Sequence, residues 1–294
     1  TGLKLLADRV DAKTMSRATA AHAASIGVSG ALSFAVGDLI AVGFGWQWAF
    51  LTAGISAAVA WFMILAVVPA RENAPQPTGA RPPLFDFRPV FRNRSAMAYA
   101  FAYAMHTLEM SALRGWGVAF LGYVAVKQDM TDAWLTPAAL VTALGLLGTA
   151  ASVSGNEAAI RFGRRRLVQT ALVLSIVFAL LTGFVGSTSY TLATILLIAY
   201  GFVIWLDSSS LTAGTAGTAE PERRGATLAV HSMLGYAGGF VGPLMVGLAL
   251  DLSGGMSPVN WGIAFSTVAV CMLIALIVFV RIRPDELAGD RGKA

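Results

Sequence analysis

The sequence predicts an all-α fold, a polytopic membrane bundle of eight transmembrane helices. Hydrophobic residues make up 56% of the 294 residues and charged residues only 13%, about half the charged share of a typical soluble domain. The mean hydropathy is +0.68. Long apolar runs recur, and a helix of about 20 apolar residues crosses a hydrocarbon core roughly 30 Å thick. Basic residues gather between the runs, most densely at residues 161–166.

The first two predicted helices follow a polar, basic start. An apolar run at residues 20–44 ends in a short glycine turn, and a second run follows at residues 46–68. Trp46 and Trp48 stand at the beginning of the second run, where an interfacial aromatic belt is expected. These two runs predict a helical hairpin.

Six further runs follow a proline-rich linker at residues 69–94, which holds six prolines and five arginines. The first of the six is interrupted by polar residues. The predicted spans are residues 95–126, 135–154, 167–185, 190–214, 226–250 and 261–280. The linker therefore divides the chain into a part with two helices, residues 1–68, and a part with six, residues 95–284. Residues 285–294 form a tail.

The distribution of basic residues predicts the topology. With eight spans, 19 of the 21 Lys and Arg residues fall on one side, and the exceptions are Lys127 and Arg114. The positive-inside rule makes that side cytoplasmic, so both termini are expected in the cytoplasm. The pI near 9.7 reflects these loops, so nucleic acid is not an expected partner. Short loops and an Ala-, Gly- and Arg-rich composition favour a prokaryotic plasma (inner) membrane.

The sequence lacks the residue patterns of several other classes. Cys271 is the single cysteine, and His22, His106 and His231 lie far apart without ligand spacing. We therefore expect no metal and no cofactor. No nucleophile–base pair is evident, so an enzyme is not expected. The chain begins at Thr1 without a signal peptide, and we interpret it as a fragment.

Two predicted helices resemble each other at an offset of 205 positions. Gly30 corresponds to Gly235, and Gly37 corresponds to Gly242. Faces of small residues let helix backbones approach closely, so Gly37, Gly235, Gly239 and Gly242 are expected to pack against other helices. Transporters are often built from repeated halves, which makes this spacing informative.

The basic loop at residues 155–166 and the seventh predicted span, residues 226–250, resemble motifs of the major facilitator superfamily. The family's loop motif is a Gly, three residues, an acid and then Arg-x-Gly-Arg-Arg. Here the matching residues are Gly155, Glu157, Arg161, Gly163, Arg164 and Arg165. Gly155 stands one place early, and Ile160 occupies the position of the acid, for which Glu157 is the replacement. Residues 238–247, with Pro243, are similar to the glycine–proline motif known from proton-coupled exporters. Residues 45–50 resemble the entry into the sixth helix.

The resemblance implies a major-facilitator-type bundle comprising the family's fifth to twelfth helices. Residues 1–68 would be the remainder of the N-terminal lobe, residues 69–94 the central cytoplasmic loop and residues 95–284 the complete C-terminal lobe of six helices. The family's first four helices would be absent from this chain. Two of those four would line the cavity, so this chain alone should not transport. The full-length protein is expected to be monomeric.

Polar side chains in the third span are candidates for a site. Tyr103, His106, Glu109 and Arg114 fall within about 140° of arc at 100° per residue. Ionisable groups inside a membrane default to a functional hypothesis, and by resemblance this helix lines the cavity. The alternative is a structural Glu109–Arg114 ion pair that closes a helix interface.

Trp205 and Asp207 in the sixth span and His231 in the seventh lie at similar depths. His231 is a possible partner of Asp207. Counting along the helices at 1.5 Å per residue places Glu109 and Asp207 near the midplane. We expect both to face one cavity and to bind substrate or a transported proton, with His106 sharing that proton.

The sequence favours a secondary-active transporter of a small solute, with proton coupling. The alternative is a non-transporting membrane sensor or assembly protein with the same fold. Neither the substrate nor the direction of transport follows from the residues.

Overall fold

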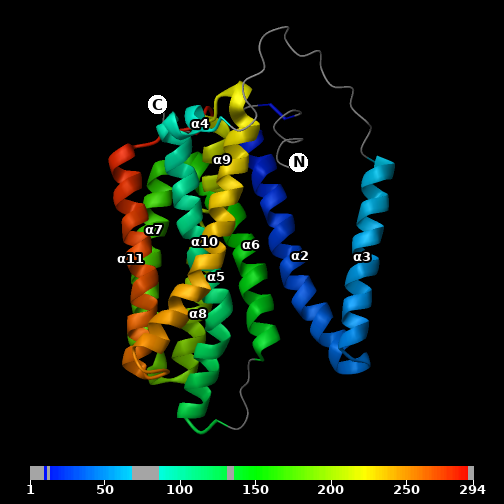
Figure 1. Ribbon diagram of the computed structural model, residues 1–294, viewed down its shortest axis with the longest axis vertical. Coiled ribbons are helices and arrows are strands. Elements are labelled where there is room, and N and C mark those ends of the chain that lie inside the picture. Colours follow the sequence, from blue (N-terminus) through cyan, green and yellow to red (C-terminus); the bar gives the residue numbers. More distant parts are fainter. Residues whose placement is uncertain (1–9, 12–13, 68–85, 131–135, 291–294) are drawn as a thin grey trace.

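The computed structural model describes residues 10–11, 14–67, 86–130 and 136–290, and these are helical with short connections (Figure 1). The α-helices are α2 (Met15–Phe44), α3 (Trp46–Val67), α4 (Arg88–Arg92), α5 (Arg94–Lys127), α6 (Pro137–Phe162), α7 (Arg164–Phe184), α8 (Tyr190–Trp205), α9 (Ser208–Thr218), α10 (Arg224–Leu252) and α11 (Pro258–Ile282). Two short 3-10 turns are η1 (Gly186–Thr188) and η2 (Pro221–Arg223). The predicted all-α class is confirmed.

Seven helical segments among the described residues are long and apolar enough to cross a membrane. They are α2, α3, α6, α7, the combined α8 and α9, α10 with η2, and α11. The remaining predicted span, residues 95–126, corresponds to α5, a 34-residue helix that is long enough but is not among the seven. Most of the predicted linker, residues 69–94, lies outside the described residues.

Local sequence explains where several helices begin. The Asn93 side chain accepts a hydrogen bond from the Ala96 backbone N–H at 3.0 Å, which caps α5. Ser189 caps α8 through the Leu192 N–H at 3.1 Å, and Ser257 caps α11 in the same way. These side chains satisfy backbone donors that have no partner within the helix.

A single glycine separates the two helices in each of two consecutive pairs. Gly45 between α2 and α3 and Gly163 between α6 and α7 both have φ of 101°. This left-handed region is costly for a side chain that carries a Cβ atom. Each glycine therefore lets the chain leave one helix and enter the next within a single residue.

Helix α5 lies in the middle of the bundle, with α10 packed along it (Figure 1). Helix α7 packs against α11, and α2 packs against α6. An aromatic core fills the end of the bundle that lies opposite the first and last described residues. Trp261 lies 5.1 Å from Phe120 between ring centroids, and Phe265 lies 5.7 Å from Phe120. This packing fixes α5 relative to α11.

The glycine face of α10 allows this helix to approach α5 closely. A Cβ atom at Gly238 would collide with the Ala104 carbonyl oxygen of α5, and one at Gly242 would collide with the Leu108 carbonyl oxygen. At Gly235 a Cβ would lie 2.5 Å from Tyr103, and at Gly239 it would lie 3.2 Å from the Ser111 hydroxyl. Four residues of α10 thus face α5 as a small-residue surface.

The two remaining residues predicted to pack against other helices, Pro243 and Gly37, differ in their contacts. The Pro243 carbonyl accepts a hydrogen bond from Trp116 Nε1 at 2.8 Å, which adds a polar contact between α10 and α5. Gly37 of α2, in contrast, has no atom within 4 Å of a Cβ position among the described residues. Its expected helix packing is therefore not seen here.

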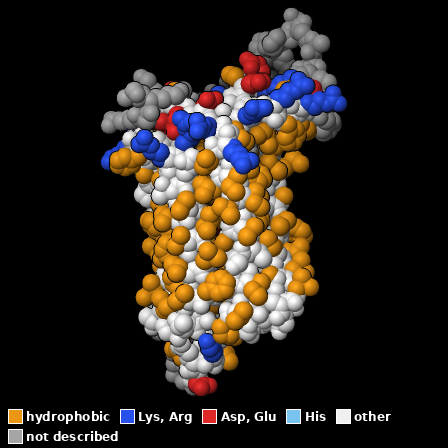
Figure 2. Space-filling model, turned by 90° about the vertical axis from the view of Figure 1, so that its left-hand side faces the viewer, with side chains coloured by type: hydrophobic (Ala, Val, Ile, Leu, Met, Phe, Trp, Pro, Cys, Tyr) orange, Lys and Arg blue, Asp and Glu red, His pale blue; other side chains and the backbone are white. Residues whose placement is uncertain are grey.

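The surface of the bundle is apolar along its length and basic at one end (Figure 2). We call this the basic end and define it by Arg165, Arg166, Arg223 and Arg224. Helix α3 stands away from the bundle beside α2 (Figure 1), and none of its residues is buried. An apolar belt of this kind is suited to lipid. The protein is an integral membrane protein.

Candidate functional site

A cavity of about 680 Å³ lies between α2, α5, the α8–α9 segment and α10. Its lining is mixed, with aromatic, hydroxyl and imidazole side chains. The lining residues are Thr19, His22, Ala23, Tyr103, His106, Thr107, Met110, Ser111, Trp205, Ser208, Thr212, Gly225, Leu228, Ala229, His231, Ser232, Gly235, Tyr236 and Gly239. Four of the residues predicted for the site, Tyr103, His106, Trp205 and His231, are brought together here.

Stacked rings form one wall of this cavity. The Tyr103 and His231 rings are stacked at a centroid distance of 3.9 Å, and Tyr103 and His106 are stacked at 5.8 Å. Trp205 meets His106 edge-on at 6.1 Å. Three helices therefore contribute rings to a single surface, and Gly235 beneath Tyr103 leaves room for the phenol ring.

His106 and Asp207 form a buried pair in the cavity wall. The His106 Nδ1 atom lies 3.1 Å from the Asp207 Oδ1 atom, and these residues are 2% and 3% exposed. Neither atom has a hydrogen-bond partner elsewhere among the described residues. Asp207 lies where α8 ends and α9 begins, and that break turns its carboxyl toward α5.

His231 has different partners from those that the sequence suggested. Its Nδ1 atom lies 3.1 Å from the Thr215 hydroxyl, and its Nε2 atom lies 3.4 Å from the Thr212 hydroxyl. Asp207 is paired with His106, so the suggested Asp207–His231 pair is wrong as a direct contact. The hydroxyl groups of α9 fix the orientation of the His231 ring instead.

Glu109 is buried next to the cavity rather than on its surface. Its Oε1 atom accepts a hydrogen bond from the Tyr200 hydroxyl at 2.7 Å, and its Oε2 atom accepts one from Ser175 at 3.1 Å. Glu109 and Asp207 are both absent from the lining. The expectation that both carboxyl groups face the cavity is therefore wrong. Of the two, only Asp207 reaches its wall, through His106.

Arg114 lines a second, small cavity that adjoins the first. Its other lining residues are Met110, Leu113, Val141, Leu144, Gly201, Ile204 and Trp205. Arg114 is exposed, and within the described ranges it makes no ion pair or hydrogen bond. The alternative of a structural Glu109–Arg114 ion pair is not seen, because Glu109 is bound by Tyr200 and Ser175.

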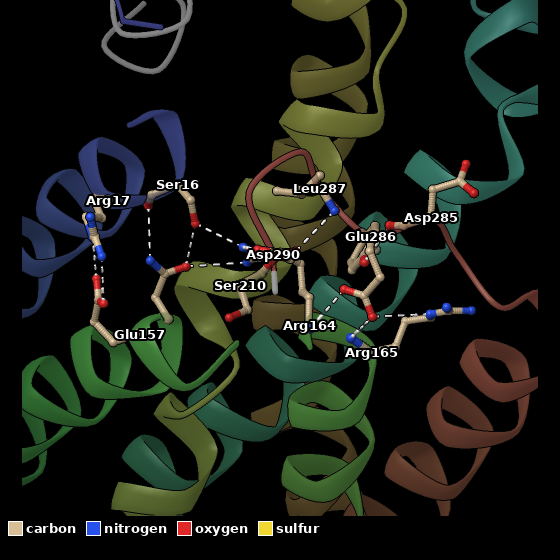
Figure 3. Close-up of polar contacts among 12 residues, drawn as sticks. Ser16, Arg17, Glu157, Arg164, Arg165, Ser210, Asp285, Glu286, Leu287 and Asp290 are labelled. Atoms are coloured by element: carbon tan, nitrogen blue, oxygen red, sulfur yellow. Dashed lines mark hydrogen bonds and ion pairs between the residues drawn. The ribbon is translucent and has the colours of Figure 1, made fainter. Parts of the chain in front are cut away.

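The arginine loop forms a polar cluster at the basic end (Figure 3). Arg164 is fully buried, and its guanidinium donates to both carboxylate oxygens of Asp290 at 3.0 Å. It also donates to the Ser16 hydroxyl at 3.0 Å and to the Ser210 carbonyl at 3.2 Å. One side chain of α7 thus connects α2, α9 and the segment that follows α11.

Neighbouring contacts extend this cluster. The Glu286 carboxylate accepts hydrogen bonds from the backbone N–H groups of Arg164 at 2.8 Å and Arg165 at 3.1 Å. Its Oε1 atom lies 3.3 Å from Arg165 Nε. A bidentate pair joins Arg17 of α2 to Glu157 of α6, with distances of 2.7 and 3.1 Å.

The other residues of the loop motif have simpler positions. A Cβ atom at Gly155 would collide with the Leu206 carbonyl oxygen, so this glycine lets α6 approach the α8–α9 junction. Arg161 is exposed at the end of α6. The motif therefore combines one close contact, one helix break at Gly163 and one fully buried arginine.

The acidic partners of the arginine loop do not follow from the loop motif. These partners, Glu286 and Asp290, follow α11 in a chain with only 16 acidic residues. This local concentration of acidic residues could have indicated the partners, because a loop with four arginines needs counter-charges. Asn156 was also missed, although its side chain exchanges hydrogen bonds with Ser16 at 2.8 and 3.3 Å.

Comparison with known proteins adds a family assignment. The family model described as Major Facilitator Superfamily matches residues 1–156. No curated protein matches the chain. Within the ranges described above, no group of three or more His, Cys, Asp or Glu side chains is arranged to bind a metal ion.

Proposed function

The chain belongs to the Major Facilitator Superfamily, and from this premise we propose that it acts as a secondary-active transporter of a small solute by alternating access. Members of this family are membrane transporters rather than enzymes. The observation that carries the proposal is the cavity enclosed by α2, α5, α8–α9 and α10. Its volume of about 680 Å³ is within the usual range of ligand sites, roughly 300–1,000 Å³.

The proposed architecture treats α5 as the eighth membrane helix. Its 34 residues extend roughly 51 Å at 1.5 Å per residue, and it lies among the seven apolar helices. We divide the chain into the helices of residues 1–68, a central loop at 69–94, a six-helix lobe at 95–284 and a tail at 285–294. The basic end faces the cytoplasm of a prokaryotic cell, and the transporter works as a monomer.

We propose that the His106–Asp207 pair couples transport to protons. A carboxylate and an imidazole 3.1 Å apart can share a proton that arrives through the cavity, because each of the two groups can hold a proton or release it. The charged and titratable groups around the pair are Glu109 on α5, His231 on α10 and His22 on α2. Loading a proton would change the attraction between α5 and the α8–α9 junction, and so favour one orientation of the cavity.

The test uses the purified full-length protein in proteoliposomes and a panel of small radiolabelled organic acids, amines, sugars and nucleosides. Asp207→Asn should reduce uptake driven by a pH gradient at least tenfold while leaving solute exchange at equal pH intact. Asp251→Asn is the matched control, because that carboxyl is exposed at the end of α10, and it should behave as the parent.

Two results would contradict these proposals separately. Driven uptake unchanged in Asp207→Asn would remove the proton role of the pair. Binding of a solute without any transport by the full-length parent protein would contradict the transport proposal and favour the sensor alternative.

A further inference from the structure

Arg114 continues the row of side chains that α5 presents to the cavity. Tyr103, His106, Met110 and Arg114 are spaced by three, four and four residues, which places them on one face of an α-helix. Met110 and Trp205 line both the main cavity and the small cavity that contains Arg114. Helical side chains lean toward the helix N-terminus, so the Arg114 guanidinium extends toward the level of Met110 at the edge of the main cavity.

The charge of Arg114 is not neutralised by the acids nearby. Glu109 accepts hydrogen bonds from Tyr200 and Ser175, and Asp207 lies against His106. In the described part of the chain, no carboxylate binds Arg114, and the main cavity has no carboxylate in its lining. A guanidinium is charged at every physiological pH. The cavity and its edge therefore offer positive charge to a solute.

We propose that the solute is a planar aromatic anion whose acidic group binds Arg114 and whose ring lies beside Trp205 and Tyr103. This inference rests on the proposed transport function and names its substrate class. The forked donors of arginine match the oxygens of a carboxylate or a phosphate in pairs. The stacked rings of the cavity wall match a flat apolar body, because offset and edge contacts between aromatic groups stabilise such an arrangement.

The length of the site agrees with a small molecule of this class. His106 and Arg114 are eight residues apart, a rise of roughly 12 Å along the helix. The arginine side chain bridges part of that distance. One aromatic ring with one acidic substituent spans the remainder between the guanidinium and the ring of His106 or Trp205.

The experiment measures binding to the purified full chain in lipid nanodiscs by isothermal titration calorimetry. The probes are benzoate, phenyl phosphate, benzamide and acetate. The parent should bind benzoate or phenyl phosphate at least tenfold more tightly than benzamide, which lacks the charge, and than acetate, which lacks the ring. Comparing the first two probes distinguishes a carboxylate from a phosphate substrate.

Arg114→Gln should remove the preference for benzoate or phenyl phosphate over benzamide. A charge-assisted hydrogen bond is strong enough to account for a loss of about tenfold or more. Arg166→Gln is the matched control, since Arg166 is exposed at the basic end, and its binding should equal that of the parent. Arg114→Lys keeps the charge without the fork and should retain part of the preference.

Several outcomes would overturn the proposal. These are benzamide binding as tightly as the anions in the parent, no binding of either aromatic anion at millimolar concentration, or an unchanged preference in Arg114→Gln. The comparison of probes in the parent still applies if Arg114→Gln does not fold. Transport of amines or sugars without anion binding would refute the substrate class and leave the transport function standing. Anion binding without transport would refute the transport function and leave the assignment of the bound chemical class standing.

Discussion

Arg164 shows how a single buried side chain can hold several segments of the fold together. Its guanidinium is fully buried and contacts Asp290, Ser16 and the Ser210 carbonyl. Burying a charge is costly unless it is paired and hydrogen-bonded, and here the acidic partner comes from the segment after α11. A basic loop can therefore contain a structural residue alongside those that define topology.

Removing this guanidinium should destabilise the protein strongly. Arg164→Ala leaves the Asp290 carboxylate buried without its counter-charge, and such a loss typically costs about 3–5 kcal/mol. Thermal unfolding in detergent should show a lowered Tm for Arg164→Ala and an unchanged Tm for Arg166→Ala, whose side chain is exposed. Equal Tm values for both variants would show that the buried cluster contributes nothing to stability.

The position of Glu109 shows the limit of reading residues from helical periodicity. At 100° per residue, Tyr103, His106, Met110 and Arg114 fall within roughly 80° of one another, whereas Glu109 stands about 120° from Tyr103. Helical periodicity alone predicts that all of these polar residues share one broad face. Side chains at the edge of such a face turn toward the neighbouring helix, and Glu109 meets Tyr200 and Ser175 there.

At the element scale, the apolar runs predicted the helices well because hydrophobic length is a strong local signal. They did not predict the break between α8 and α9, since residues 190–214 read as one continuous run. Depth along a helix follows from counting residues, but rotation about its axis depends on packing. Asp207 stands at the break between α8 and α9, and its partner is His106 rather than His231.

The contact between α10 and α5 depends on glycines that differ in available space. Gly242→Ala places a Cβ against the Leu108 carbonyl oxygen and should destabilise the protein by about 1–3 kcal/mol, as overpacking does. Gly239→Ala needs only a small shift of the Ser111 hydroxyl, so its effect should be smaller. Thermal unfolding of both, with Gly30→Ala as a control in open space, checks this ranking. A Gly242→Ala protein as stable as the Gly30→Ala protein would contradict it.

At the scale of the whole molecule, the charge distribution relates the fold to the membrane. The Lys and Arg side chains gather at one end of the visible surface, above an apolar belt (Figure 2). The sequence predicted this asymmetry because it is a property of loops, which need no tertiary information. The cavity between α2, α5, α8–α9 and α10 could only be anticipated as a set of polar residues, because helix order in the chain does not determine helix neighbours.

The predicted orientation can be tested with single cysteines on exposed residues at the two ends. In a Cys271→Ser background, an impermeant maleimide should label Thr188→Cys in intact cells. It should label Glu222→Cys only after permeabilisation. Both positions are exposed in the structure, whereas Gly292, another candidate for labelling, lies outside the described residues. The opposite labelling pattern would reverse the proposed topology.

The cluster around Arg164 also has a consequence for biosynthesis. Its acidic partners Glu286 and Asp290 follow it by 122 and 126 positions in the sequence. At translation rates of about 5–20 residues per second, the ribosome needs roughly 6 to 24 seconds to make that interval. During this time Arg164 has neither of these counter-charges, so the basic end cannot reach its final arrangement. Its closure is therefore a late event, after α8, α9, α10 and α11 have already been synthesised.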